Sequence, residues 1–367
     1  MDPATQALRD AILAAAAQKT ALRIRGGCSK DFLSPTRAAP VLDTRDLRGI
    51  ISYEPSELVV TVRAGTPLAE LEAALAEQSQ YLAFEPPHFD WRGSGAQGTV
   101  GGMVAAGLSG PARANAGSVR DYVLGAQLLN GWGELLQFGG TVMKNVAGYD
   151  VSRLLAGSWG SLGVLTQVSL KVQPVAPAQA TLEFALDAAA ALAKLHRWGA
   201  QPLPLNASCW TPAPVAPSER LRLRLRGAQA AVESACQRLL AEVPGQRLDA
   251  MAAERFWNDV RHLRSRFFHP PAEADQMLWR LSLPQTTPML ELPWPQQIEW
   301  HGAQRWLWAN AAAAPVLHAA AQKAGGQASL FYAPQGTQLP RHAPLPDVQA
   351  RIQRQIQAEF DPAGLFS

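Results

Sequence analysis

The sequence predicts an α+β protein in two parts, because its glycines and its strand patterns are unevenly distributed. Glycine density rises sharply between residues 92 and 163 and falls after Pro174. Apolar strand-like runs at 123–129 and 164–172 are threaded between these glycines, so the stretch indicates a loop-rich sheet domain and not low complexity. Beyond it, strand and helix patterns alternate, which predicts a smaller antiparallel α+β domain of ferredoxin-like type. We expect the domains at residues 1–175 and 176–367.

The first part opens with a short helix, followed by a strand that runs into a glycine turn. The spacing of apolar residues predicts an amphipathic helix over 3–18 and a strand over 22–25. Residues 58–63 alternate as a further strand. Thr66-Pro67 then predicts an N-cap and a first helical position for a helix over 68–78.

The second part alternates strands with helices. The expected strands are 180–186, 220–226, 277–283, 298–301, 306–309 and 328–332, and the expected helices are 188–198, 228–242, 252–266 and 316–323. In the strand 220–226 arginine alternates with leucine, so one face is leucine and the other arginine. That arginine face is either solvated or a surface that docks an acidic partner subunit.

Composition excludes several classes of protein. The net charge of +3 is small for 367 residues and no Lys/Arg blocks occur, so nucleic acid is not an expected partner. The three cysteines, Cys28, Cys209 and Cys236, are too few and too scattered for a disulfide framework, a zinc site or an iron–sulfur cluster. No apolar run approaches the ~20 residues of a membrane span. We expect a cytoplasmic protein without a metal, peripheral at the inner membrane only through partner chains.

A glycine turn follows the first predicted strand, at Ile24-Arg25-Gly26-Gly27-Cys28-Ser29-Lys30. Successive backbone N–H groups in such a turn form a concave anion site, and the missing side chains let a pyrophosphate approach. A plain turn is the other interpretation of the same residues.

A second segment, Gly98-Thr99-Val100-Gly101-Gly102-Met103-Val104-Ala105-Ala106-Gly107, interleaves glycines with small residues. It can lie flat against a planar or phosphate-bearing ligand while Val100 and Val104 pack inward. Close packing of a helix on a sheet would need the same small residues. The later Gly157/Gly160/Gly163 spacing is not a Rossmann fingerprint, because the expected strand and ribose-binding acid are missing, which disfavours a nicotinamide cofactor.

Taken in order, six motifs resemble the PCMH-type FAD-binding domain of the vanillyl-alcohol-oxidase superfamily. They are Arg25-Gly26-Gly27, Ala64-Gly65-Thr66-Pro67-Leu68, Gly98-Thr99-Val100-Gly101-Gly102, Gly117-Ser118-Val119-Arg120-Asp121, Gly148-Tyr149-Asp150 and Gly160-Ser161-Leu162-Gly163-Val164. The resemblance covers roughly residues 1–175 and implies a two-part FAD-binding domain.

The resemblance also implies which residues bind the cofactor. They are Arg25, Gly26, Gly27, Cys28, Ser29, Lys30, Pro87, Gly98, Thr99, Val100, Gly101, Gly102, Ser118, Asp121, Gly160, Gly163 and Val164. We expect the FAD to be non-covalent, because covalent members often have a histidine just after the glycine turn, where this chain has Ser29.

A closer resemblance is to the FAD-binding subunit of bacterial glycolate oxidase. It rests on the segments 84–89, 139–154 and 360–366, which read Phe-Glu-Pro-Pro-His-Phe, Gly-Gly-Thr-Val-Met-Lys-Asn-Val-Ala-Gly-Tyr-Asp-Val-Ser-Arg-Leu and Phe-Asp-Pro-Ala-Gly-Leu-Phe. This resemblance implies a hetero-oligomer with a larger homologous FAD-containing catalytic subunit and an iron–sulfur subunit, which oxidises glycolate to glyoxylate. The chain departs from the family at Cys28, where a third glycine is usual, and lacks the C-terminal Asn-Pro-Gly continuation.

Catalytic residues are not identified by the sequence. Catalytic 2-hydroxy-acid dehydrogenases of this superfamily carry a His-x-Gly-Asp-Gly-Asn-x-His-like motif in the C-terminal half, and none of the seven histidines here lies in such a setting. Removing the hydroxyl proton of a 2-hydroxy acid needs a positioned base beside the flavin, so we expect the chain not to be catalytic alone. The stretch 261–269, with Arg261, Arg264 and His269, either binds a carboxylate or is a surface helix end.

Two alternatives remain open at this point. One is a self-sufficient FAD-dependent 2-hydroxy-acid dehydrogenase of the D-lactate type, and the other is a scaffold subunit that has lost its flavin.

Overall fold

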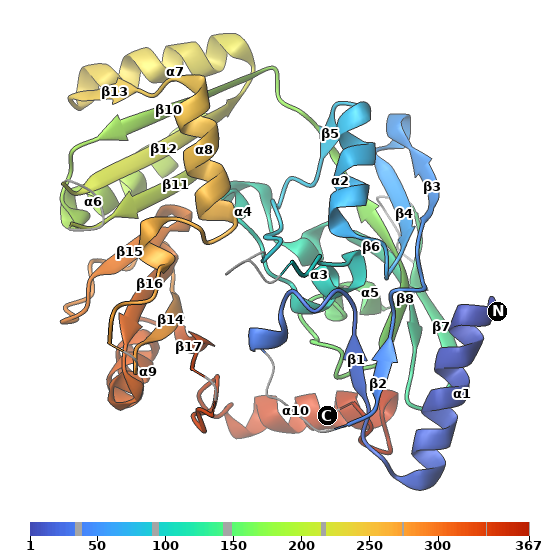
Figure 1. The fold of residues 1–367 in the computed structure, drawn as a ribbon. Helices are drawn as coiled ribbons and strands as arrows, with labels where there is room; N and C mark the ends of the chain where they lie inside the picture. The colour runs from blue at the N-terminus through green and yellow to red at the C-terminus, as the bar shows by residue number, and fades with distance from the viewer. Residues whose placement is uncertain are drawn as a thin grey trace. The chain divides into compact units, whose positions relative to one another are not determined.

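The computed structural model describes residues 1–33, 39–89, 95–141, 149–213, 218–273, 275–334 and 336–366. The chain forms two compact units (Figure 1). The first consists of Met1–Ser109, Gly117–Val175 and Leu345–Ser367, and the second of Gly110–Ala116 and Ala176–Pro344. The units divide after Val175, and the segments 110–116 and 345–367 each belong to the unit on the other side of that division.

The first unit is built on a five-stranded antiparallel sheet with the order β3-β4-β8-β6-β7. Its strands are β3 (Ile50–Glu54), β4 (Val59–Arg63), β6 (Val123–Leu129), β7 (Leu135–Gly139) and β8 (Val164–Lys171). The central strands β4 and β8 are buried along nearly their whole length, as their valine-rich sequences predict.

Short elements surround this sheet. They are α1 (Pro3–Gln18), the parallel pair β1 (Arg23–Arg25) and β2 (Val41–Asp43), α2 (Leu68–Glu77), α3 (Val100–Ala106), α5 (Val151–Leu154), α10 (Asp347–Phe360) and the small antiparallel pair β5 (Gln80–Tyr81) and β9 (Gln173–Pro174). The Asp2 side chain caps α1 by accepting a hydrogen bond from Thr5 N, as expected for an N-cap aspartate.

The C-terminal residues are tied into the core of the first unit. Leu365 is buried in a cluster with Leu8, Ile12 and Leu22, and its carbonyl accepts a hydrogen bond from Leu22 N. The Asp361 carboxylate accepts from the backbone N–H groups of residues 365 and 366, which fixes the turn. This anchoring explains why 345–367 belongs to the first unit.

The second unit contains an eight-stranded antiparallel sheet with the order β13-β10-β12-β11-β15-β16-β14-β17. Its strands are β10 (Ala178–Phe184), β11 (Leu205–Thr211), β12 (Arg220–Gly227), β13 (Gly245–Arg247), β14 (Met277–Ser282), β15 (Gln296–Glu299), β16 (Gln304–Ala309) and β17 (Gln327–Tyr332). Its helices are α4 (Arg113–Ala116), α6 (Ala188–Gly199), α7 (Gln229–Glu242), α8 (Ala250–Arg261) and α9 (Ala314–Lys323).

The sheet of the second unit consists of two halves with the same strand order. The first half runs β10-α6-β11-β12-α7-β13 along the chain and is ordered β13-β10-β12-β11, which is the ferredoxin-like arrangement that the sequence predicts. The second half repeats this order as β17-β14-β16-β15, but residues 283–295, between β14 and β15, contain no helix. The halves meet where β11 pairs with β15. This repeat of strand order is not visible in the sequence, where we find no exact repeat.

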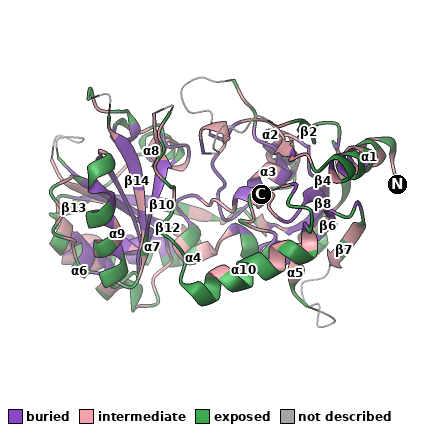
Figure 2. Ribbon diagram, turned by 90° about the horizontal axis from the view of Figure 1, so that it is seen from below, coloured by how far each residue is buried: buried purple, intermediate pink, exposed green. Residues whose placement is uncertain are grey.

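Each half has its own apolar core. Trp198 and Leu239, from α6 and α7, pack with the leucines of β12 in the first half, whereas Leu317 of α9 packs with Trp279 and Leu307 in the second. Figure 2 shows the buried strands of both units in purple and the exposed helix α10, which has no buried residue, in green.

Two of the four arginines on the face of β12 form neither of the two surfaces expected from the sequence. Arg222 lies 2.6 Å from the Glu183 carboxylate and over the ring of Phe256. Arg224 is buried, donates to Asn206 Oδ1 at 2.6 Å and lies over Trp257. Because α8 supplies both aromatic rings, these two arginines are part of the packing within the second unit and are not a solvated or free docking face.

Two element boundaries differ from the expected ones for local reasons. The predicted N-cap role of Thr66 is wrong: α2 begins at Leu68 after Pro67, and the buried Thr66 hydroxyl accepts from Gly49 N at 2.9 Å instead. The helix expected over 252–266 ends at Arg261, because Leu263 has a left-handed backbone (φ 54°). In the described part of the chain, no helix is both long and apolar enough to cross a membrane.

Candidate functional site

The first unit contains a cavity with about 820 Å³ of space, including its open mouth. Residues assigned by resemblance that line it are Arg25, Gly26, Gly27, Cys28, Ser29, Lys30, Thr99, Gly101, Gly102, Gly160 and Gly163. Lining residues that the sequence did not single out as binding residues are Ile24, Asp31, Thr44, Ala64, Ala105, Ala106, Ser158, Trp159 and Leu165.

The glycine turn after β1 forms one wall of the cavity. Its glycines are required because neighbouring residues lie too close to leave room for a Cβ atom. A Cβ atom on Gly27 would lie 1.4 Å from the carbonyl oxygen of Gln97, and one on Gly26 would lie 2.5 Å from Thr99 Oγ1. Cys28, the next residue, has a left-handed backbone with φ 62°. The turn therefore brings bare backbone to the cavity surface, as an anion site requires.

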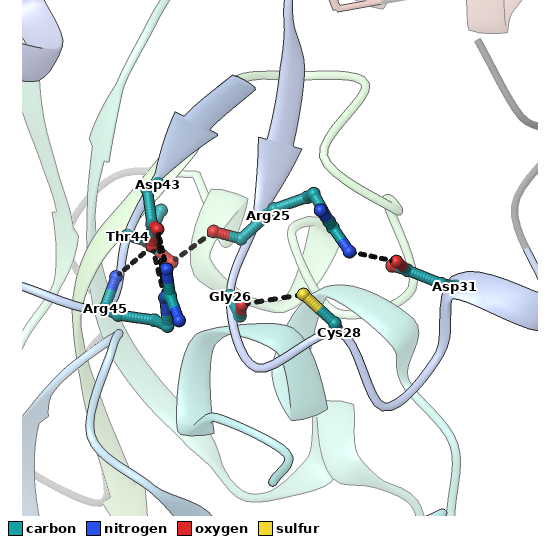
Figure 3. Close-up of polar contacts among 7 residues, drawn as sticks. All are labelled: Arg25, Gly26, Cys28, Asp31, Asp43, Thr44 and Arg45. Carbon is teal, nitrogen blue, oxygen red and sulfur yellow. Dashed lines mark hydrogen bonds and ion pairs between the residues drawn. The ribbon is translucent and has the colours of Figure 1, made fainter. Parts of the chain in front are cut away.

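Side chains around the turn hold it in place (Figure 3). Arg25 is ion-paired with Asp31, and its carbonyl oxygen accepts hydrogen bonds from the Thr44 backbone N–H and hydroxyl. Arg45 forms an ion pair with Asp43 at the end of β2, and its hydrogen bonds hold the pKa of the Asp43 carboxyl below its usual value. Arg25 Nε is buried and has no hydrogen-bond partner among the residues that the structure describes. That unsatisfied donor beside the cavity fits an anionic ligand group.

Helix α3 forms the second wall. The Thr99 hydroxyl caps it by accepting from Gly102 N, and Val100 and Val104 are fully buried, as expected. A Cβ atom on Gly101 would lie 2.7 Å from Ala64 Cβ, whereas one on Gly102 would meet Thr99 Oγ1 at 3.1 Å. Both glycines are helical, without positive φ, so sterics and not backbone strain restrict them.

Lys30 places a positive charge in the cavity wall. Its ammonium lies 3.3 Å from Ser29 Oγ and 5.7 Å from the centre of the Phe89 ring. Burial lowers the pKa of Lys30 to about 8. The lysine is therefore still largely charged at neutral pH, in a place where a phosphate or another anionic group would be stabilised.

The turn before β8 completes the lining. Trp159, Gly160 and Gly163 all have positive φ, and a Cβ atom on Gly163 would lie 2.5 Å from the Leu129 carbonyl oxygen. Half of the Trp159 side chain is exposed at this position. The turn thus needs its glycines for two separate reasons, backbone conformation and close approach.

Several assigned residues do not line the cavity. These are Pro87, Gly98, Val100, Ser118, Asp121 and Val164. Ser118 and Asp121 instead form a capping box around a short 3-10 helix, with the Asp121 carboxylate accepting from the Ser118 backbone and hydroxyl at 2.8 Å. Within the segment 139–154, residues 142–148 lie outside the described part of the chain.

The structure does not assemble a catalytic constellation from the described residues. No three histidine, cysteine, aspartate or glutamate side chains among them are grouped to hold a metal ion. Three of the histidines are used in hydrogen bonds: His88 with Glu72, His196 with the Gln285 carbonyl and His301 with Asn115. Arg261 ends α8, and Arg264 and His269 follow it.

Comparison with known proteins gives the class of this protein. Residues 4–151 match the family described as an FAD binding domain. The fold is similar to that of xylooligosaccharide oxidase from Myceliophthora thermophila C1, with a TM-score of 0.66 and 15% identity, over 100% of this chain and 89% of that one. Fold and family match together define a PCMH-type flavoprotein whose cofactor is FAD.

The sequence comparison is more specific. The chain is 42% identical over 364 residues to glycolate oxidase subunit GlcE of Escherichia coli K12, covering 99% of this chain and 96% of that protein. It belongs to the glycolate oxidase subunit GlcE family. It is also 31% identical to glycolate oxidase subunit GlcD of Bacillus subtilis, but only over 148 residues, 40% of this chain and 30% of that protein.

Proposed function

We propose that this chain is the FAD-binding subunit of a glycolate oxidase complex, which oxidises glycolate to glyoxylate, and that it does not catalyse the reaction alone. The observation that carries the proposal is the similarity to GlcE along essentially the whole length of both proteins. A similarity confined to the FAD domain would support only a shared cofactor.

The cavity of the first unit is the proposed FAD site. Its unsatisfied Arg25 Nε, the Lys30 ammonium and the bare backbone around Gly27 are the groups that would hold the anionic part of the cofactor. When bound, FAD supplies a redox group that exchanges electrons with a substrate or with another centre. The chain's own contribution is to bind and orient that group.

The need for a partner follows from the side chains around the cavity. Among the described lining residues the only carboxylate is Asp31, and it is held by Arg25 and Arg23. A base that removes the hydroxyl proton must lie beside the substrate with its carboxylate available to accept that proton. A carboxylate that is ion-paired with two arginines is not available in this way. We infer that a larger homologous FAD-containing subunit supplies the catalytic residues and that an iron–sulfur subunit accepts the electrons. Placement at the inner membrane would then come through these partners.

The experiment compares the purified chain alone with the chain reconstituted with its two expected partners. We expect flavin absorption bands in the isolated chain, no glycolate-dependent dye reduction by it, and dye reduction once the partners are added. Equal turnover in both samples would overturn the subunit proposal and favour a self-sufficient dehydrogenase. Absence of flavin bands after purification with added FAD would favour the scaffold without flavin.

A further inference from the structure

One aromatic side chain lines the cavity of the first unit. It belongs to Trp159, in the turn before β8, and no other aromatic residue is among the described residues that line the cavity. Trp159 keeps 47% of its surface exposed. An indole contributes a large free energy when it is fully packed, so a half-exposed tryptophan contributes only part of it. Its exposed ring is accessible to a ligand in the cavity.

The backbone at Trp159 is unfavourable for this type of residue. Its φ of 54° lies in the left-handed region, where the Cβ atom of any residue except glycine is crowded. Gly157 and Gly160, in the same turn, also have positive φ, and they adopt it without strain. Strained residues are concentrated at ligand sites, where the surrounding structure holds them in place. The strain is therefore a second indication that the ring of Trp159 has a role in binding.

The turn that carries Trp159 is fixed by α3 and β1. Trp159 N donates to the carbonyl oxygen of Ala105 at 2.9 Å, and Gly157 N donates to that of Val104 at 3.1 Å. On the other side, a Cβ atom on Gly160 would lie 3.2 Å from Ile24 Cδ1. Because the backbone is already held by these contacts, little of it has to become ordered when a ligand meets the indole, and this favours binding.

The cavity lining around the indole suits a ligand with a planar ring and an anionic part. The other apolar lining residues are Ile24, Ala64, Ala105, Ala106 and Leu165. The cationic lining residues are Arg25 and Lys30, both in the segment of the glycine turn. An indole binds a planar heteroaromatic ring by offset stacking on its face. FAD has two such rings, the isoalloxazine and the adenine, joined through its pyrophosphate.

We propose that the indole of Trp159 stacks on one of the two aromatic rings of the bound cofactor, and that this contact sets much of the affinity of the cavity for FAD. The inference rests on the proposed FAD site. It assigns to Trp159 a part in binding that the glycine motifs of the sequence do not indicate, because those motifs describe backbone that approaches the ligand and not a side chain that contacts it.

The test is calorimetric titration of FAD into the full-length chain freed of flavin. Trp159→Ala should weaken FAD binding by about tenfold, because the stacked ring is lost. Trp159→Phe keeps an aromatic face and should lose clearly less. Trp132→Ala is the matched control, because Trp132 is also exposed, at 57%, but lies in the turn between β6 and β7 and is not among the lining residues. Its affinity should equal that of the unaltered chain.

Competition experiments identify the ring. FMN and ADP, each of which carries one ring and a phosphate group, are added as competitors of FAD. Weaker competition by FMN in Trp159→Ala than in the unaltered chain places the indole on the isoalloxazine, and weaker competition by ADP places it on the adenine. A change with neither competitor overturns stacking on either ring.

The remaining outcomes separate this inference from the proposed FAD site. Failure of the unaltered chain to bind FAD overturns the site and the stacking together. Normal FAD binding by the unaltered chain with equal affinity in Trp159→Ala overturns the stacking alone, as does an equal loss in Trp159→Ala and Trp159→Phe. Should Trp159→Ala fail to fold, Trp159→Gly, which suits the left-handed backbone, takes its place with the same expected loss.

Discussion

The Cys28 thiol lies 3.4 Å from the carbonyl oxygen of Gly26, within the turn after β1 (Figure 3). Cys28 adopts a left-handed conformation there, φ 62°, which is costly for a residue with a Cβ atom. In the resembling family this position is usually a third glycine. In this structure Cys28 therefore has the left-handed backbone that glycine adopts without strain.

The first prediction follows from this conformation. Cys28→Gly should stabilise the protein by up to about 1 kcal/mol, because relief of the left-handed strain, about 1–2 kcal/mol, exceeds the extra entropy of the unfolded chain. Thermal unfolding of the FAD-free chain measures the change. Lys19→Gly is the matched control: Lys19 is also left-handed, φ 52°, but lies at the end of α1, away from the cavity. A stability loss in Cys28→Gly alone would show that the thiol contact outweighs the strain.

The second prediction separates the two adjacent glycines of α3. Gly102→Val should fold normally but purify with little FAD, because the side chain would project into the cavity beside Thr99 and Lys30. Gly101→Val should instead lose about 1–3 kcal/mol of stability, because its Cβ would overlap Ala64 on the packed side of the helix.

The measurements for this pair are the ratio of flavin to protein absorbance and the unfolding midpoint in denaturant. Gly140→Ala serves as the control, since a Cβ atom there would meet nothing within 4 Å. Full FAD occupancy in Gly102→Val would contradict the placement of the cofactor along α3.

The sequence predicts the FAD domain well because its glycines are fixed by local geometry. The glycines of the turn at Gly26 and Gly27 and the small residues of α3 form a pattern that can be recognised in the sequence. They occur where a neighbouring segment lies too close to leave room for a larger side chain. The same reasoning places most strands, because their alternation is local. It cannot show that Phe256 and Trp257 of α8 cover two arginines of β12, because this contact joins elements that are far apart in the sequence.

The third prediction concerns His301, a buried histidine in the second unit. The Asn115 side-chain amide donates to the Asn206 carbonyl at 3.0 Å and faces His301 Nε2 at 2.5 Å, so Nε2 accepts and the imidazole is neutral. Its Nδ1 is buried and has no hydrogen-bond partner in the described part of the chain. Burial lowers the pKa of His301 to about 4.

Because the pKa of His301 is lower in the folded chain than in the unfolded chain, the protein should become less stable as the pH falls. The unfolded chain, with a histidine pKa near 6.5, takes up a proton at higher pH than the folded chain does. The stability present above pH 6.5 is therefore lost as the pH falls below it. From pH 7 to pH 5 this group should remove roughly 2 kcal/mol of the free energy of unfolding. Denaturant unfolding at the two pH values measures it.

Two variants isolate the contribution of His301. His301→Asn should flatten the pH dependence between 7 and 5, and asparagine tolerates the left-handed backbone at this position, φ 56°. His269→Asn, at an exposed histidine, should leave the dependence as it is. An unchanged slope in His301→Asn would show that His301 is protonated in the folded state at pH 5.

The last prediction is that the flavin is held without a covalent bond. Ser29 follows the glycine turn where covalent relatives of this fold often have a histidine, and no histidine is among the described residues that line the cavity. The side chains there that could attack a flavin are the Cys28 thiol and the Lys30 amine. The amine is mostly protonated at neutral pH, because its pKa is about 8, and a protonated amine is not a nucleophile. The thiol is directed to the Gly26 carbonyl.

Acid precipitation should therefore leave all yellow colour in the supernatant and a colourless pellet. A yellow pellet would disprove the prediction, and the same precipitation of Cys28→Ser would then show whether the thiol is the site of attachment, since only a cysteinyl bond is lost in that variant.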